Sequence, residues 1–452
     1  MEFNRYNNMY FIGIGGIGMS ALARYFNNQM NIFGYDRVKS PLCIQLECEG
    51  MEIHYKEDVN QISVSKEDTL IVYTPAISSN HLELSYFLTH NYTVMKRSEV
   101  LGKITEDHFT IAVAGTHGKT TTSTMIAHLL SSSDKNCTAF LGGISKNYNS
   151  NFIQNGNSDV IVVEADEYDY SFLTLYPDVA IITSLDLDHI DVYGNEKNMI
   201  SSFQSFSHNI KSGGTLILEG NIDTSLFVKD DISVIRYSTN LDVMNIAENI
   251  KHESGSVKFD ISLNNYKIDG FHMNMVGEYN VSNALASLSV SQLLGLSNQQ
   301  LRSGILSFLG IERRFDILVS NLDLIYIDDY AHHPVEIFSV LSAVRKAYPN
   351  RNLTVIFQPH LYSRTNDLIE EFAESLSLAD DLILLDIYAA REENIYDITS
   401  NDLLKICTNK VKTLSNIDSV LDLISNKDLD VLITLGAGDI SDIVSKIKDN
   451  IS

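Results

Sequence analysis

Short apolar runs alternate with amphipathic stretches along the whole chain. Runs such as 160–163 and 431–433 are rich in Val, Ile and Leu, as buried β-strands are. The segment 280–294 instead repeats its apolar residues at helical spacing, with one face formed by Val281, Ala284, Leu285 and Leu288. This alternation of strand and helix patterns predicts α/β domains with mainly parallel sheets.

The pattern changes between residues 240 and 275. The segment 257–261 alternates apolar and polar residues, and Asn-Asn and Asp-Gly pairs follow at 264–265 and 269–270. Such pairs are typical of tight turns between antiparallel strands. We therefore expect a small antiparallel region here, followed by the helix at 280–294.

Three strand-like runs end in a glycine-bearing turn, at 10–18, 111–118 and 431–438. Because the intervening sequences do not match, these are three separate nucleotide-fold-like units and not a tandem repeat. The polar stretches 104–108 and 312–315 mark the expected boundaries. The predicted domains are 1–106, 107–314 and 315–452.

Composition limits the possible partners. The chain has 452 residues, of which 44% are hydrophobic, and 33 Lys and Arg against 58 Asp and Glu give a net charge of −25. Such an acidic surface disfavours nucleic acid and anionic membranes, so anionic substrates need local cations. The four cysteines lack the spacing of a zinc site or a disulfide framework. No signal peptide or membrane-length apolar run is present, which predicts a cytoplasmic protein without membrane insertion.

The turn after the second of these strands has the residues of a phosphate cradle. Gly115 and Gly118 precede Lys119 and Thr120, and a helical pattern follows at once. Lys119 would neutralise the β- and γ-phosphates and the Thr120 hydroxyl would bind Mg²⁺. The usual P-loop has four residues between its first glycine and the Gly-Lys pair, whereas this chain has two. An ordinary strand–turn–helix connection is the alternative, but the residues favour a bound nucleoside triphosphate.

The first glycine turn carries Gly13-x-Gly15-x-x-Gly18, and Asp36 follows 18 residues later. This spacing is typical of a dinucleotide fingerprint, in which the acidic residue binds a ribose hydroxyl. It suits an NAD-dependent oxidoreductase, and equally any protein that places a pyrophosphate at a helix N-terminus. The separate triphosphate cradle argues against a simple dehydrogenase.

Acidic residues and a histidine follow two central strands. Glu164, Asp166 and Glu167 come directly after the run 160–163, where a Mg²⁺ ligand is expected downstream of a phosphate cradle. A solvated acidic turn is the alternative for Asp166 and Glu167. His189 lies in a polar turn after the next strand, and we expect it to contact metal or phosphate.

The last third repeats this arrangement. The strand 325–327 runs into Asp328–Pro334, and the strand 355–357 runs into Gln358–Arg364. Both strand ends carry polar groups that could hold a carboxylate, a ribose or an amine. Arg313-Arg314 at the domain junction could reach a phosphate through forked hydrogen bonds, with a surface charge pair as the alternative.

Taken together, these motifs resemble the Mur ligases of peptidoglycan synthesis over essentially the whole chain. The resemblance rests on 13–20, 115–122, 164–167, 188–189, 280–283, 313–316, 328–334, 358–360 and 436–438. It implies an α/β protein of three domains: a Rossmann-like domain that binds a UDP-sugar, a central P-loop ATPase-type domain with a mostly parallel sheet, and a Rossmann-like C-terminal domain for the amino acid. It also implies ATP-driven amide formation through an acyl phosphate, with L-alanine joined to the carboxylate of UDP-N-acetylmuramate.

The resemblance also assigns roles to individual residues. Those implied to be catalytic are Lys119, Glu164, His189, Arg313 and His332. ATP would contact Gly115, Thr116, His117, Gly118, Lys119, Thr120, Thr121, Asn280, Asn283 and Asp329. The other substrates would contact Gly15, Gly16, Gly18, Asp36, His360 and Arg364, and Mg²⁺ would be held by Thr120, Glu164 and His189.

Some positions depart from the family pattern. Leu361 stands where relatives often carry an arginine that binds the amino-acid carboxylate, and Tyr168 stands where many have Ser. The segment 203–206 offers no lysine for the carbamylated metal ligand of some relatives, so none is predicted. The alternatives are a recycling ligase that adds a preformed peptide, an NAD-dependent oxidoreductase and a non-catalytic ATP switch. A monomer or homodimer is expected.

Overall fold

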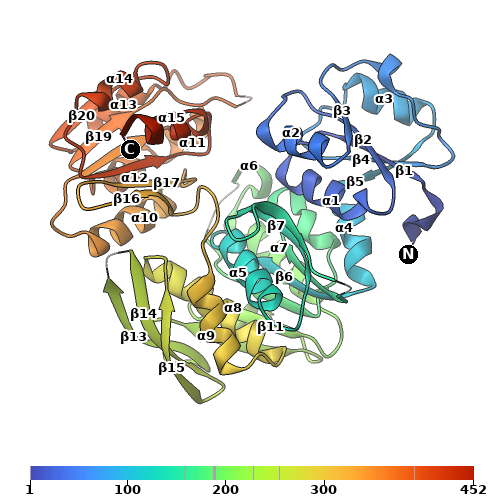
Figure 1. Cartoon of the computed structure of the whole chain (residues 1–452), viewed down its shortest axis with the longest axis horizontal. Coiled ribbons are helices and arrows are strands. Elements are labelled where there is room, and N and C mark those ends of the chain that lie inside the picture. Colours follow the sequence, from blue (N-terminus) through green and yellow to red (C-terminus); the bar gives the residue numbers. More distant parts are fainter. Residues whose placement is uncertain are drawn as a thin grey trace. The chain divides into compact units, whose positions relative to one another are not determined.

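The computed structural model describes residues 2–156, 158–186, 190–227, 229–253, 255–390 and 392–451 (Figure 1). Contacts divide the chain into two compact units. The first comprises residues 1–248, 261–269 and 282–305, and the second comprises 249–260, 270–281 and 306–452. Among the described residues, no helix combines the length and apolar character that crossing a membrane would require.

The first unit begins with a five-stranded, fully parallel sheet of order β3-β2-β1-β4-β5. Buried apolar residues fill its inner strands, and Ser40 caps the second helix by accepting a hydrogen bond from the Cys43 amide. The elements are η1 (Glu2–Arg5), β1 (Asn8–Ile12), α1 (Ile17–Asn27), β2 (Asn31–Tyr35), α2 (Pro41–Cys48), β3 (Glu52–His54), η2 (Val59–Gln61), β4 (Thr69–Tyr73), α3 (Leu82–Thr89), β5 (Thr93–Lys96) and α4 (Arg97–Glu106).

A ten-stranded sheet follows, with the order β15-β14-β13-β12-β11-β10-β6-β9-β7-β8. Parallel pairs join β7, β9, β6, β10, β11, β12 and β13, whereas β7 and β8 form an antiparallel hairpin. The strands are β6 (Phe109–Ala114), β7 (Thr138–Ser145), β8 (Ser150–Gln154), β9 (Val160–Glu164), β10 (Val179–Ile182), β11 (Thr215–Glu219), β12 (Ser233–Ser238), β13 (Asn245–Glu253), β14 (Ser256–Leu263) and β15 (Tyr266–Met273). The helices are α5 (Lys119–Ser131), η3 (Tyr168–Thr174), α6 (Ile190–Tyr193), α7 (Glu196–His208), η4 (Thr224–Phe227), α8 (Glu278–Leu293) and α9 (Asn298–Ser307).

The last sheet has six strands in the order β16-β17-β21-β18-β19-β20, and only β16 is antiparallel to its neighbour. Its inner strands β17, β18 and β21 are buried along their whole length, as parallel strands covered on both faces are. The elements are β16 (Asp316–Ser320), β17 (Ile325–Asp329), α10 (Pro334–Ala347), β18 (Leu353–Phe357), α11 (Tyr362–Asp367), α12 (Ile369–Leu376), β19 (Asp381–Leu384), α13 (Ser400–Ile406), β20 (Val411–Leu414), α14 (Val420–Ser425), β21 (Val431–Leu435) and α15 (Ser441–Ile451).

The predicted fold class is confirmed: three α/β sheets, mostly parallel, follow one another along the chain. The helix expected at 280–294 is α8, and β13, β14 and β15 are neighbours in the region expected to be antiparallel. The stretch 104–108, expected to contain a domain boundary, covers the end of α4 at Glu106 and leads into β6, and Ile104 is buried.

Candidate active site

The glycine fingerprint forms a tight turn between β1 and α1. The Gly15 amide donates to Asp36 Oδ2 at 2.8 Å, and the Val38 amide donates to Asp36 Oδ1 at 3.1 Å. A Cβ on Gly15 would lie 2.5 Å from Cys43 Sγ, so only glycine fits. The spacing of Asp36 from the fingerprint predicts that it binds a ribose hydroxyl. In the structure its carboxylate is engaged by the backbone and fixes the shape of the turn.

The second glycine turn lies between β6 and α5, the helix that carries the Gly-Lys-Thr sequence. Gly118 is the N-cap of α5 with φ +84°, and a Cβ there would lie 2.5 Å from Asn283 Oδ1. Asn283 Oδ1 also accepts a hydrogen bond from the Thr122 hydroxyl at 3.3 Å, so α8 is tied to the start of α5. Thr120 and Thr121 lie in the first turn of α5 and are buried. A helix N-terminus behind a glycine turn is suited to binding phosphate.

The neighbouring strand connection holds this turn in place. The Thr116 hydroxyl donates to the Asp186 carbonyl at 2.7 Å, and the His117 amide donates to Ser184 Oγ at 2.9 Å. The Thr183 hydroxyl donates to the Ala114 carbonyl at 3.1 Å. These hydrogen bonds, together with that from the Thr116 amide to the Ser184 carbonyl at 3.3 Å, anchor the turn to the end of β10.

Lys119 is the buried cation of the turn. Its ammonium donates to the carbonyls of Gly115 at 2.7 Å and Thr116 at 3.2 Å, and to Glu167 Oε1 at 2.8 Å. Burial works against the charged amine, but Glu167, Glu164 and Asp166 together raise the pKa of Lys119. The lysine is thus held charged beside the N-terminus of α5.

The acidic motif after β9 divides into three environments. Glu164 Oε2 accepts the Gly142 amide at 3.1 Å, so β7 orients the residue predicted to bind metal. Glu167 is 2% exposed and pairs with Lys119, which excludes a solvated acidic turn for this residue. Burial and the nearby Glu167 raise the pKa of Asp166, whose carboxylate lies 3.8 Å from Arg97 Nη2.

A Mg²⁺ ion held beside Thr120 and Glu164 would need few protein ligands. Within the described ranges, no group of three or more His, Cys, Asp or Glu side chains gathers as a metal site. Mg²⁺ commonly takes one or two protein oxygens and completes its shell with phosphate and water. Glu164 acts electrostatically on Lys119, so it lies within range of the phosphate turn, and it therefore fits such a site together with Thr120. His189, the third predicted ligand, lies outside the described residues.

The second unit gathers its polar residues at the ends of β17 and β18. Asp329 is buried and accepts the amides of Phe315 at 2.6 Å and Ala331 at 2.7 Å. Burial raises its pKa to about 6, against the opposing effect of Arg314 and the two amides. Asn280 donates to the Val276 carbonyl at 2.8 Å, within its own helix start.

His332, His360 and Arg364 lie close together in this unit. The two imidazole rings meet edge to face at 5.7 Å, and Tyr388 stacks on His360 at 5.6 Å. Burial lowers the pKa of His332 to about 4, and burial with the Arg364 charge lowers that of His360 to about 4. The Glu336 carboxylate lies 3.3 Å from His332 Nδ1, so the two neutral rings have both a carboxylate and a guanidinium nearby, a combination that suits a small zwitterion.

Arg313 is not half of a surface charge pair. Its Nε donates to Asp328 Oδ2 at 3.1 Å and its Nη2 donates to the Gly436 carbonyl at 2.6 Å. Asp328 is 1% exposed, so this pair belongs to the interior of the unit. Arg313 and Arg314 both lie over the Tyr330 ring, at 5.3 and 5.0 Å from its centroid.

Comparison with known proteins decides the family. Profiles described as "Mur ligase family, catalytic domain", "Mur ligase middle domain" and "Mur ligase, glutamate ligase domain" match residues 8–109, 113–291 and 313–438. The UDP-N-acetylmuramate–L-alanine ligase of Porphyromonas gingivalis strain W83 is 45% identical over 97% of this chain and 98% of its own length. The chain belongs to the Mur ligase family.

Other relatives of this Mur ligase agree. The protein of the same name from Flavobacterium psychrophilum is 43% identical over 99% of both chains. The crystal structure of the UDP-N-acetylmuramate-alanine ligase of Thermotoga maritima superposes with a TM-score of 0.84 at 26% identity, covering 98% of each chain. The structural match includes all three sheets, so the agreement extends beyond the phosphate turn.

Two residues of this Mur ligase site were missed or left open by sequence reasoning. Glu167, treated as possibly solvated, is the buried partner of Lys119. Arg97, at the start of α4, was not considered; its guanidinium lies beside Gly18, where a Cβ would be 2.7 Å from Nη1. Only the position of Arg97 directly after a strand could have drawn attention to it.

Proposed function

We propose that the protein joins L-alanine to the carboxylate of UDP-N-acetylmuramate with hydrolysis of ATP to ADP and phosphate, acting as a monomer or homodimer. One observation carries the proposal. The chain aligns over nearly its full length with proteins named UDP-N-acetylmuramate–L-alanine ligase. It also carries the glycine turn at 13–18, the phosphate turn at 115–121 and the cluster of His332, His360 and Arg364. The oxidoreductase and switch-protein alternatives are not favoured by these relatives.

Each unit would supply part of the reaction. Gly15, Gly16 and Gly18 would receive the UDP diphosphate at the start of α1, and Asp36 would keep their turn in shape. Lys119 and the amides at the start of α5 would hold the β- and γ-phosphates of ATP, with Asn280, Asn283 and Asp329 contributing further nucleotide contacts. His360 and Arg364 would bind the amino acid.

The chemical problem is to bring a carboxylate to the γ-phosphate, since both are anions. Lys119, held charged by its carboxylate neighbours, would stabilise the negative charge that develops on the phosphate. Mg²⁺ held by Thr120 and Glu164, with His189, would add charge neutralisation at the same phosphates. Arg313 and His332 would act on the transferring phosphate and the incoming amine. His332, which burial keeps neutral, could accept a hydrogen bond from that amine.

The test is amino-acid-dependent release of phosphate from ATP. Purified protein receives UDP-N-acetylmuramate and ATP together with L-alanine, glycine, L-serine or the L-alanine-containing tripeptide of the recycling reaction. We expect release with L-alanine at the highest kcat/KM. Release only with the tripeptide would move the protein to the recycling activity, and no release with any of them would refute the ligase proposal.

Lys119→Ala should abolish turnover, by about 10³-fold or more, because an essential charge at the phosphates is lost. UDP-N-acetylmuramate should still bind with an affinity close to that of the native protein, since its turn lies at the start of α1. Isothermal titration with the sugar nucleotide, alongside the phosphate-release assay, checks both statements. Simultaneous loss of turnover and sugar binding would contradict the assignment of the two turns to different substrates.

A further inference from the structure

The helix that starts at the fingerprint turn, α1, packs against the hairpin β7–β8 of the ten-stranded sheet. The Tyr25 ring meets the rings of Phe140 at 5.3 Å and Phe152 at 6.2 Å. Tyr25 and Phe140 are about 5% exposed, so this part of the contact is closed to water. Apolar packing of this kind supplies adhesion, but it tolerates small sliding movements between its surfaces.

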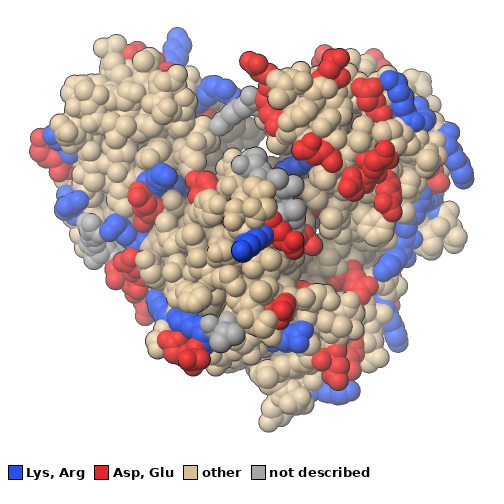
Figure 2. Space-filling model, turned by 180° about the vertical axis from the view of Figure 1, so that it is seen from behind, with Lys and Arg blue, Asp and Glu red and all other residues tan. Residues whose placement is uncertain are grey.

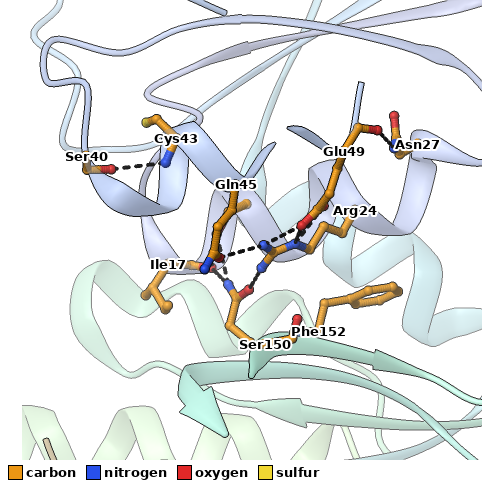
Figure 3. A network of polar contacts seen from close by, with 11 residues as sticks. Ile17, Arg24, Asn27, Ser40, Cys43, Gln45, Glu49, Ser150 and Phe152 are labelled. Atoms are coloured by element: carbon orange, nitrogen blue, oxygen red, sulfur yellow. Dashed lines mark hydrogen bonds and ion pairs between the residues drawn. The ribbon is translucent and has the colours of Figure 1, made fainter. Parts of the chain in front are cut away.

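A buried polar network runs beside these rings. Arg24 is 8% exposed, and its guanidinium forms a forked pair with Glu49, in which Nε donates to Oε2 at 2.9 Å and Nη2 to Oε1 at 2.7 Å. The remaining nitrogen, Nη1, donates to Asn151 Oδ1 on β8. Figure 3 shows the Arg24 guanidinium between Glu49 and the strand that carries Ser150 and Phe152. One side chain thus joins the two domains.

Asn151, on β8, makes the remaining hydrogen bonds of this network to α1. It is fully buried, and its Nδ2 donates to Ser20 Oγ at 2.9 Å and to the Ile17 carbonyl at 2.5 Å. Both partners lie in the first turns of α1. Moving the helix along the hairpin would therefore leave buried donors and acceptors without partners, which is costly. The polar network fixes one register for the contact.

The same hairpin touches the phosphate site. Gly142, on β7, donates its amide to Glu164, the residue proposed to bind metal. Asn151 on β8 contacts Ile17, which lies between Gly16 and Gly18 of the turn proposed to bind the UDP diphosphate. The hairpin therefore lies between the two substrate sites and contacts the elements that build both of them.

We propose that Arg24 and Asn151 are positioning residues that set the register between the bound sugar nucleotide and the phosphates of ATP. The proposal rests on the ligase function proposed above. Neither residue need touch a substrate. Their task is to keep the muramate carboxylate and the γ-phosphate at reacting distance, because a misplacement of about 1 Å can cost about 10²-fold in rate.

The test compares two arginine-to-lysine substitutions. Arg24→Lys keeps the charge but cannot reach Glu49 and Asn151 together through a forked group. Arg345→Lys is the matched control, because Arg345 makes similar bonds to Leu378 and Asp380 inside the last domain and lies outside the proposed site. We expect kcat of Arg24→Lys to fall at least about 10-fold, with KM and Kd for ATP and the sugar nucleotide within about threefold of the native values. Arg345→Lys should keep kcat within about twofold at a similar loss of Tm.

Asn151→Leu provides a second route should Arg24→Lys fold poorly. It removes the hydrogen bonds of Asn151 to Arg24, Ser20 and Ile17 while keeping the number of side-chain heavy atoms, and it should give the same split between kcat and KM. Combined with Arg24→Lys it should lower kcat little further than either change alone, because both disrupt one contact. Hydrogen exchange of the α1 and β8 amides should quicken in both variants, while exchange in β18 stays unchanged.

Several results would overturn the proposal. If Tm falls but kcat stays at the native value in both variants, the network is structural only. If the affinity for the sugar nucleotide falls as far as kcat, the residues act within that site and not across the contact. Absence of amino-acid-dependent phosphate release in the native protein would refute the ligase function itself, which separates that failure from failure of the positioning role.

Discussion

At the scale of single residues, the Lys119–Glu167 pair shows how a buried cation is kept charged at the proposed phosphate site. A buried ammonium without a partner is costly, and the protein itself supplies three acceptors to Lys119. Phosphate oxygens would have to compete with Glu167 for the same protons. The site is therefore organised around a charge that a bound phosphate would share with Glu167.

Gly118 gives a residue-scale prediction. Gly118→Ala combines strain at φ +84° with a contact of 2.5 Å to Asn283, so we expect a loss of about 2–4 kcal/mol in unfolding free energy and weaker ATP binding. Gly213→Ala is the matched control, because its φ of +79° is similar and nothing lies near its Cβ position. Denaturant unfolding of both variants isolates the contact. Equal losses would show that Asn283 moves aside freely.

His360 predicts a pH dependence. Its pKa is lowered to about 4 in the folded protein, against about 6.5 when unfolded, so the unfolded state binds the proton more readily. The contribution of neutral His360 is present above pH 6.5 and is lost as pH falls towards 4. Unfolding free energy of the native protein should therefore drop by about 1–2 kcal/mol more than that of His360→Gln across this window. The exposed His208→Gln serves as control, and a parallel fall in all three proteins would contradict the prediction.

At the residue scale, local sequence patterns can indicate only those candidate sites whose residues are contiguous in the chain. Strand-end glycines and the Gly-Lys-Thr turn are contiguous in sequence, so Gly115–Thr121 could be read directly. The roles of Glu167 and Arg97 could not, because they depend on contacts between segments far apart in the chain: Glu167 with Lys119, and Arg97 with both Gly18 and Asp166. Asp36 has the sequence spacing of a ribose-binding residue, but spacing alone could not reveal that its carboxylate accepts the Gly15 amide of the turn.

At the scale of elements, α4 packs closely against η3. Gly102 of α4 faces the Thr174 carbonyl, where a Cβ would approach to 2.4 Å, and the Thr174 hydroxyl donates to the Ser98 carbonyl at 2.8 Å. The helix can approach this closely only because residue 102 lacks a side chain. This contact, like that of α1 with the hairpin, joins the first domain to the second.

Gly102→Ala should therefore destabilise the protein by about 1–3 kcal/mol, despite the better helix propensity of alanine, because a backbone carbonyl cannot easily move. Gly304→Ala, in α9, is the control: its Cβ would meet the Leu129 side chain at 2.6 Å, and a flexible side-chain end can shift. Thermal unfolding should show a clearly larger fall in Tm for Gly102→Ala. A smaller fall than in the control would mean that α4 can slide on η3.

Elements were more predictable than their junctions. Alternating apolar runs identified the strands and α8, since burial on both faces imposes a strong local pattern. The end of α4 at Glu106 has no clear sequence signal, because polar residues at 106–108 follow directly on the buried Ile104. Positive backbone angles at Asp169 and Tyr170 inside η3 follow from tertiary contacts and have no glycine signal to announce them.

At the scale of the whole molecule, the net charge of −25 works against both nucleotide substrates. Figure 2 shows acidic and basic side chains interspersed on one face, so the excess charge is distributed. The summed field repels ATP and the sugar nucleotide at long range, and it is screened by salt. The association rate constants of both nucleotides should therefore rise about two- to tenfold between about 10 and 150 mM ionic strength at fixed Mg²⁺.

Stopped-flow binding of a fluorescent ATP analogue would measure this salt dependence. Neutral L-alanine provides the internal control, since its binding should change little over the same range. A decrease in the nucleotide association rate with salt would show that the local cations, Lys119 above all, dominate the long-range field.

The division of the chain into its two compact units has a consequence for exchange between relatives. Residues 249–260 and 270–281 belong with the last unit, whereas 261–269 and 282–305 return to the first. A gene cut at residue 315 would separate part of the last unit from the rest of it. Chimaeras that swap the C-terminal third as a single cassette should thus be impaired. A crossover at residue 249 would instead separate 261–269 and 282–305 from the first unit, so recombination within this family is expected to avoid single crossovers between residues 249 and 315.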